Sequence, residues 1–464
     1  MSAQPQQLVD TALAASTADG CVVIVSEHSE TNLRWAANSL TTNGQMRSRS
    51  MTVVSTFDKP GGTSAGVVTR ALSTVDEVGD LVRASEAAGR TADAADDASP
   101  LVEAYQHADD WTSPPAETSV AVFDTAAPAL GAAFDRWRTG NRLMFGFAEH
   151  QMTSYFLGTS TGLRRRFDQP DGRLEVNGKS ADYTRSAWAG VHTRDFTDVN
   201  VDAVVDGLEQ RLDWAATRID LPAGQYETIL PPSAVSDLLI YAYWTASARN
   251  ADEGRNVYAK GEGGTRIGEQ LSSMPLMLRS DPAEPGLECT PFDVVTSSGD
   301  MQSVFDNGQP VSATKWIDEG TLTNLMRTRA WARKTDTAPC PGVENLIFEG
   351  APGGDGRSLD EMIASTERGL LLTTLWYIRE VDPQTLLLTG LTRDGVYLVE
   401  NGTVRGAVNN FRFNESPIDL LGRLTEVGRT EHTLPREWND YFRRTAMPAV
   451  RVPDFNMSTV SKGV

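Results

Sequence analysis

The sequence predicts an α+β protein of two domains. We expect an N-terminal mixed α/β domain with an antiparallel meander, and a C-terminal, mostly β domain with one buried apolar helix. The 464 residues exceed the size at which one hydrophobic core usually stops growing. Helical and strand-like patterns alternate in the first half, whereas glycine and short β-like runs dominate the second. The helix-breaking segment 220–224 separates the two patterns, which gives domains 1–224 and 225–464.

The N-terminal domain is expected to begin with a helix over residues 8–15. Three separate strands follow in the prediction, at residues 21–26, 32–37 and 51–55. Apolar residues then recur every three or four positions over residues 75–88, which predicts an amphipathic helix that ends at Gly89.

Short alternating runs between residues 143 and 188 predict an antiparallel meander. The strand-like runs are 143–148, 154–157, 163–167 and 174–176. The Gly-Thr-Ser-Thr-Gly segment 158–162 is predicted to be a hairpin turn, because a phosphate-binding loop would lead directly into a helix. An amphipathic helix is predicted over residues 201–215.

The C-terminal domain is expected to open with a strand at 226–230 and a helix at 233–247 behind two prolines. This helix is apolar on nearly every side, which is typical of a helix buried in a core or at a subunit interface. The β-like runs that follow are 276–279, 294–297, 301–305, 346–349, 370–378, 395–400 and 403–409.

Charge and composition exclude several classes of function. The formal net charge of −20 would repel both a nucleic-acid backbone and an anionic membrane surface. Residues 1–10 do not resemble a signal peptide, and no apolar run is long enough for a membrane span. Three distant cysteines fit a reducing compartment. We therefore expect a cytoplasmic protein that binds neither nucleic acid nor membrane.

Several segments together resemble the TldD/PmbA family, known as peptidase subunits and once described as modulators of DNA gyrase. They are Arg-Trp-Ala-Ala-Asn-Ser-Leu at 34–40, Tyr-Phe-Leu-Gly-Thr-Ser-Thr-Gly at 155–162, the Pro-Pro helix unit, and the run 370–417. The last run includes Asp-Pro-Gln-Thr at 382–385 and Asn-Asn-Phe-Arg-Phe-Asn-Glu at 409–415. These segments occur in the same order as in the family, and together they extend over nearly the whole chain.

The resemblance implies where a zinc site would lie. In the catalytic branch of the family, the apolar helix carries His-Glu-x-x-x-His, and a C-terminal cysteine adds a third ligand. The corresponding positions here are Ile240, Tyr241 and Thr245, and no cysteine follows Cys340. We therefore expect no catalytic residue, no metal ligand and no cofactor in this chain, and bulky apolar groups filling the former catalytic cavity.

The TldE/PmbA branch of the family also lacks these residues. The resemblance thus implies a non-catalytic subunit that pairs with a TldD-like zinc-bearing subunit as a heterodimer or larger oligomer. The complex would be a metallopeptidase acting on unfolded peptides, with zinc in the partner. Candidate substrate-channel or interface residues are Tyr243, Trp244, Asn410 and Arg412.

Two other classes of function stay open at this level. The chain could be a peptide-binding or scaffold homodimer without a protease partner, or a hydrolase with an unrecognised site. Glu149-His150 and His192-x-x-Asp195 are the local acid–histidine pairs that a relay or a metal would use. The nucleophile-elbow motif Gly-x-Ser-x-Gly does not occur in the sequence.

Overall fold

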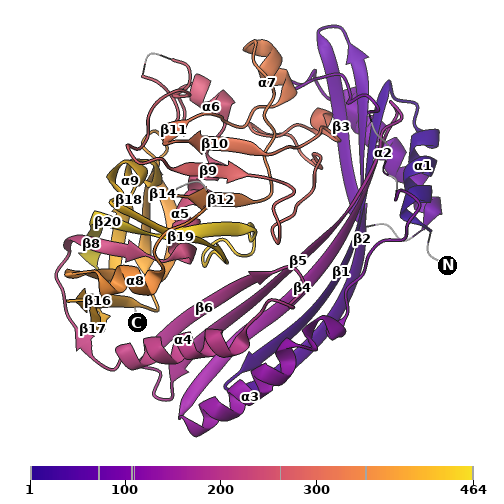
Figure 1. Cartoon of the computed structure of the whole chain (residues 1–464). Coiled ribbons are helices and arrows are strands. Elements are labelled where there is room, and N and C mark those ends of the chain that lie inside the picture. Colours follow the sequence, from indigo (N-terminus) through magenta and orange to yellow (C-terminus); the bar gives the residue numbers. More distant parts are fainter. Residues whose placement is uncertain are drawn as a thin grey trace.

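The computed structural model describes residues 3–71, 74–105, 108, 110–261, 263–350 and 353–461. Their strands form two sheets, one of six strands and one of fourteen. The first sheet arches along one side of the molecule, and the second lies in the half that follows (Figure 1). This arrangement confirms the α+β class, with an antiparallel N-terminal sheet and a mostly β C-terminal half.

The six-stranded sheet, sheet A, is antiparallel with the strand order β3-β2-β1-β4-β5-β6. Its elements are α1 (Pro5–Ala15), β1 (Gly20–Ala36), β2 (Ser39–Lys59), β3 (Gly62–Ala71), α2 (Val78–Thr91), α3 (Ala126–Thr139), β4 (Arg142–Thr159), β5 (Arg164–Ser180), β6 (Ser186–Thr193) and α4 (Val201–Trp214).

The strands of sheet A are longer than the sequence patterns predicted. The two runs at 21–26 and 32–37 are one strand, β1, and the four runs of the meander are β4 and β5. The polar stretch between the first two runs stays in the ladder because β1 has a paired strand on each side. Its side chains also find partners across the strands, as Glu27 does with Arg49.

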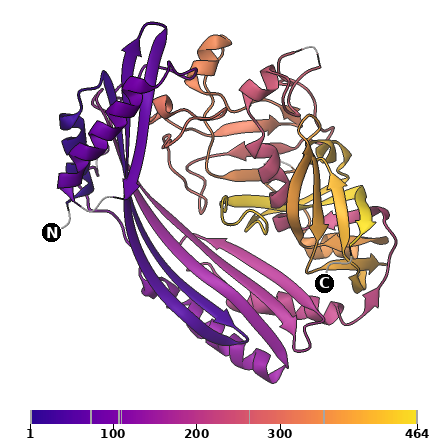
Figure 2. The same cartoon turned by 180° about the vertical axis from the view of Figure 1, so that it is seen from behind.

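Helices cover the outer, convex face of sheet A (Figures 1 and 2). α1 and α2 pack on one end of the sheet through a cluster that includes Leu8, Val23 and Leu81. α3 and α4 pack on the other end around Trp35 and Trp137. α2 continues to Thr91, past the glycine that was predicted to end it.

The fourteen-stranded sheet, sheet B, mixes parallel and antiparallel pairs, and β20 is its longest strand. Its strands are β7 (Arg218–Ile219), β8 (Gly224–Leu230), β9 (Met277–Ser280), β10 (Thr314–Asp318), β11 (Thr321–Leu322), β12 (Leu346–Glu349), β13 (Arg368–Leu372), β14 (Leu375–Asp382), β15 (Leu387–Thr392), β16 (Val396–Glu400), β17 (Thr403–Val408), β18 (Phe411–Glu415), β19 (Glu426–Thr433) and β20 (Thr445–Val460). The helices of this half are α5 (Pro232–Trp244), α6 (Ala248–Asp252), α7 (Arg329–Lys334), α8 (Leu359–Ala364) and α9 (Pro417–Arg423).

The inner face of sheet A meets the C-terminal half. Near one end, Ile24 and Leu157 pack against Phe292 and Phe305 from the segment before β10. Further along the sheet, charged side chains of β4 and β5 meet the segment that leads into β20. The boundary predicted at 224/225 lies at the start of β8 and stays a prediction. Within the described ranges, no helix combines the length and apolar character needed to cross a membrane.

Candidate functional site

The positions that the family resemblance assigns to a zinc motif, Ile240, Tyr241 and Thr245, lie in and directly after α5. The helix starts at Pro232, where a missing backbone N–H costs nothing, and nine of its side chains are buried. Ile240 is completely buried in the core. Tyr241 is half-buried and packs edge-on against Trp438, at 5.6 Å between ring centroids. The Thr245 hydroxyl donates back to the Tyr241 carbonyl at 2.9 Å.

A segment before β20, residues 436–444, covers the end of α5. The Trp438 indole N–H donates to the Asp237 carbonyl at 2.8 Å, and the Asp237 carboxylate accepts the Glu437 backbone N–H at 2.9 Å. Phe442 packs against Tyr243 and Trp244, with centroid distances of 5.8 and 6.5 Å. The structure therefore brings residues 436–444 together with the end of α5.

The last two arginines of the same segment, Arg443 and Arg444, pair with carboxylates of sheet A. Arg444 donates to the half-buried Asp171 carboxylate at 2.6 Å, and Arg443 lies 2.9 Å from Glu149. Burial opposes ionisation of Asp171, but Arg444, then His192 and Arg443, outweigh it and hold the pKa of this carboxyl well below its usual range. The network ties residues 436–444 to the inner face of β4 and β5.

These residues do not fit a zinc ion. Isoleucine offers no donor atom, and zinc sites in proteins use thiolate, imidazole or carboxylate ligands. In the part of the chain that the structure describes, no three His, Cys, Asp or Glu side chains gather in an arrangement that could hold a metal.

A cavity of about 350 Å³ lies beside the end of α5, between the inner face of sheet A and the C-terminal half. Tyr243 and Trp244 form part of its wall, and Tyr155 and Gln169 reach it from β4 and β5. The Tyr243 hydroxyl accepts the Val343 N–H at 2.7 Å and donates to the Val343 carbonyl at 2.8 Å, which fixes the loop at 341–344. Aromatic groups thus occupy the end of α5. The expectation that bulky apolar side chains fill the whole cavity was wrong, because a space of about 350 Å³ remains beside them.

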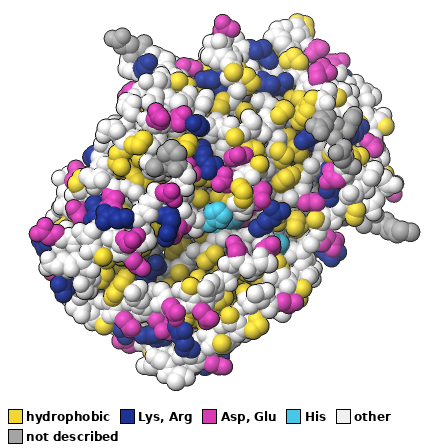
Figure 3. Space-filling model, viewed as in Figure 1, with side chains coloured by type: hydrophobic (Ala, Val, Ile, Leu, Met, Phe, Trp, Pro, Cys, Tyr) yellow, Lys and Arg dark blue, Asp and Glu magenta, His cyan; other side chains and the backbone are white. Residues whose placement is uncertain are grey.

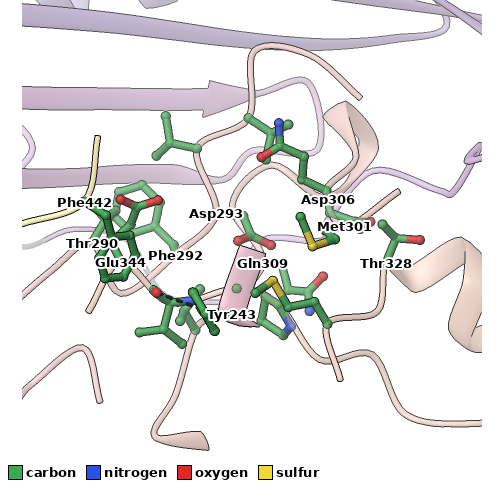
Figure 4. A pocket seen from close by; sticks show the side chains of 18 of the residues that line it. Tyr243, Thr290, Phe292, Asp293, Met301, Asp306, Gln309, Thr328, Glu344 and Phe442 are labelled. Carbon is green, nitrogen blue, oxygen red and sulfur yellow. Dashed lines mark hydrogen bonds between the residues drawn. The ribbon is translucent and has the colours of Figure 1, made fainter. Parts of the chain in front are cut away.

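Segment 290–311 supplies two of the three acidic groups of this cavity, Asp293 and Asp306. Asp293 points into it, close to Gln309 (Figure 4). Burial, then the nearby Asp306, raises the pKa of the Asp293 carboxyl well above its usual range; Arg329 opposes the shift and Glu344 adds to it. Asp306 is itself bound by the Arg329 guanidinium at 2.7 Å. Sequence reasoning missed Asp293, although an acidic residue inside the apolar run Pro-Phe-Asp-Val-Val was a usable signal.

The structure does not bring Asn410 and Arg412 to this cavity. Asn410 precedes β18 and lines a separate shallow pocket of about 270 Å³ with Trp376 and Tyr377. Arg412 is exposed on β18, where it donates to the Thr389 hydroxyl at 3.2 Å. A role for these two residues would therefore involve a different surface from that of Tyr243 and Trp244.

The two acid–histidine pairs of the sequence are not pairs in space. Neighbouring residues of a strand point to opposite faces, so Glu149 turns to Arg173 and Arg443 while His150 packs on the outer side. Both ring nitrogens of His150 already have partners, Thr118 and the Arg194 carbonyl, and burial lowers its pKa. His192 faces Asp171 at 3.5 Å rather than Asp195.

Comparison with known proteins identifies the class of this fold. Residues 223–459 match the family model described as the PmbA/TldA metallopeptidase C-terminal domain. The chain belongs to this metallopeptidase-related PmbA/TldD family. No curated protein sequence matches the chain significantly.

Solved structures of the same fold extend over nearly the whole chain. TldE from Thermococcus kodakarensis superimposes with a TM-score of 0.77 at 16% identity, over 97% of this chain and 99% of that one. A candidate modulator of a DNA gyrase from Thermotoga maritima gives 0.76 at 17% identity, with the same coverage. A third structure, from Bacteroides thetaiotaomicron, gives 0.73 at 15% identity, over 98% of both chains.

Proposed function

We propose that this chain is the non-catalytic subunit of a heteromeric zinc metallopeptidase that acts on unfolded peptides or small proteins. The observation that supports the proposal is the chemistry of the positions that the family resemblance assigns to the zinc motif. Ile240 and Tyr241 of α5 and the following Thr245 stand at these positions, and the covering segment carries Arg443 and Arg444. The zinc and its general base would then belong to a TldD-like partner.

The role left to this chain is to form part of a substrate channel. An extended peptide can add to an exposed strand edge through backbone hydrogen bonds, which read little of its sequence. β3 pairs with β2 over residues 50–59, so no described strand covers residues 39–49 on the side away from β1. On the face in Figure 3, acidic and basic side chains surround a hollow with hydrophobic groups inside. These features support a peptide-binding surface.

Reconstitution with a TldD-like subunit tests the proposal. Size-exclusion chromatography should show a defined complex with an interface of at least about 1,000 Å². The complex should cleave an unfolded peptide, whereas each chain alone should be weak or inactive. The decisive control is Glu→Gln in the partner's zinc motif. Cleavage that survives this change and still requires our chain would place the catalytic residues here and refute the proposal.

A further inference from the structure

The cavity beside α5 carries hydrogen-bonding groups that the protein itself does not use. Gln309 is only 8% exposed, and Figure 4 shows its side chain at the pocket together with that of Asp293. Among the described residues, neither the Gln309 amide nor the Asp293 carboxyl has a hydrogen-bond partner. The amide oxygen of Gln169, a wall residue that is 7% exposed, also lacks one. Since buried polar groups are nearly always bonded, unused groups around a cavity indicate a ligand.

The unused groups are mainly acceptors, which favours a ligand rich in donors. Three carboxyl groups line the cavity, at Asp293, Asp306 and Glu344. Asp306 is neutralised by Arg329, and Glu344 lies at the exposed rim, 3.4 Å from Arg444. Asp293 is half-buried in the cavity wall, and among the described residues it forms no ion pair. It is therefore the acidic group with no cation of its own.

The remaining walls suit an aliphatic chain. Phe292, Met301 and Val311 provide apolar contacts. The volume, about 350 Å³, lies at the lower end of the range for small-ligand pockets, roughly 300–1,000 Å³. Ammonium and guanidinium groups carry only donors, so they complement an unpaired carboxylate and unpaired amide oxygens.

We propose that this cavity binds an organic cation, an alkylammonium or guanidinium group held by Asp293 and Gln309. The cation would be carried by a lysine or arginine side chain of a peptide or by a free amine. The peptide case rests on the peptide-binding role proposed above and adds a preference for basic residues. The amine case stands without a partner subunit.

Cation binding at Asp293 is coupled to release of a proton. In the empty cavity, burial and the neighbouring Asp306 favour the neutral carboxylic acid. A cation beside it favours the carboxylate, so the carboxyl proton leaves to solvent as the ion pair forms. The other charged groups around the cavity are Asp306, Glu344, Arg327, Arg329 and Arg444. Affinity for the cation should therefore rise as the pH rises through the raised pKa of the Asp293 carboxyl.

Calorimetry of the full-length chain tests the inference with three probes. They are Nα-acetyl-lysine amide, the neutral Nα-acetyl-norleucine amide, and butylammonium. The lysine probe should bind at least about tenfold more tightly than the norleucine probe. Titration in buffers of different ionisation enthalpy should show release of up to one proton per bound cation. Binding by butylammonium but not by the lysine probe would assign the cavity to free amines.

Two variants complete the test. Asp293→Asn should weaken cation binding at least about tenfold and abolish the proton release. Asp300→Asn removes an acidic group from the same segment outside the cavity wall, and it should change the affinity less than about twofold. Because Asp293→Asn removes a buried carboxyl of raised pKa, the variant should melt no lower than wild type at pH 7, which separates lost binding from unfolding.

Equal binding of the lysine and norleucine probes, or unchanged cation binding by Asp293→Asn, would overturn the inference. Either result would leave partner-dependent peptide cleavage untouched. Conversely, a chain that binds butylammonium but forms no active complex with a TldD-like subunit would refute the proposed function and keep the cation pocket.

Discussion

At the residue scale, Tyr243 shows how a side chain of α5 fixes the loop that lines the cavity. Its hydroxyl makes two hydrogen bonds to the backbone of Val343, and burial raises its pKa far above the usual value, so it stays protonated. The ring packs between Trp316 and Phe442. Tyr243 therefore fixes the cavity wall.

Tyr243→Phe should destabilise the protein by about 1–3 kcal/mol, because it leaves the buried Val343 N–H and carbonyl without their partner. Urea unfolding measures the change. Tyr441→Phe is the matched control: Tyr441 lines the same cavity, but its side chain is 76% exposed, and the change should stay within about 0.5 kcal/mol. Equal effects of the two changes would contradict this role for Tyr243.

At the element scale, the contact of α2 with β3 depends on two glycines. A Cβ at Gly66 would lie 2.1 Å from the Ser85 carbonyl oxygen and 2.2 Å from the Gly89 nitrogen. Ser85 uses this closeness to donate to the Gly66 carbonyl at 2.8 Å. Gly89 is therefore needed for the close contact between α2 and the sheet. It does not mark the end of the helix, which continues to Thr91.

Gly66→Ala should cost about 1–3 kcal/mol or more, because the added methyl group collides with backbone atoms and pushes α2 off the sheet. Thermal unfolding, with circular dichroism as the signal, measures it. Gly131→Ala in α3 adds the same group to open space and should stabilise the helix by about 0.5–1 kcal/mol. A neutral result at Gly66 would mean that the two elements separate easily.

At the scale of the whole molecule, the two halves are joined by a largely enclosed network of charges between β4, β5 and residues 440–444. Asp171 of β5 pairs with Arg444, while Arg173 lies 3.1 Å from Glu149 and 2.7 Å from Asp440. Removing one partner of a buried pair leaves the other charge uncompensated, which costs far more than losing a surface pair. The network thus fixes how sheet A sits against residues 436–444.

Asp171→Asn should lower the free energy of unfolding by about 3 kcal/mol at pH 7, since Arg444 loses its closest carboxylate. The folded pKa of Asp171 lies below the unfolded value of about 3.9, so its contribution is complete above pH 4 and is lost as the pH falls through the folded pKa. The gap between wild type and variant should therefore narrow below pH 4. Denaturant titrations at pH 7 and pH 3 measure this.

The exposed pair of Asp135 and Arg138 provides the control. Asp135→Asn removes a carboxylate that is 79% exposed and should change stability by less than about 0.5 kcal/mol at either pH. A pH-independent effect of Asp171→Asn would show that packing, rather than charge, joins the halves at this point.

The sequence by itself determined the class of the fold, the apolar helix α5 and the absence of His, Cys, Asp and Glu at positions 240, 241 and 245. The fold class and the helix follow from the local periodicity of apolar residues, and the chemistry at Ile240, Tyr241 and Thr245 follows from residue identity. Neither requires knowledge of tertiary contacts. Strand length was misjudged because pairing on both sides of β1 outweighs its polar stretch.

Only the tertiary structure decided which groups share the cavity. Asp293, Gln169 and Arg444 are far apart in the chain, and the meeting of sheet A with segments 290–311 and 436–444 places them around one space. The same packing removes water from Asp293, which raises the pKa of its carboxyl. It also places cations beside Asp171, which lower the pKa of that carboxyl, so one residue type favours the neutral form at one position and the charged form at the other. Such a difference arises from long-range burial and from neighbouring charges, which local sequence patterns do not contain.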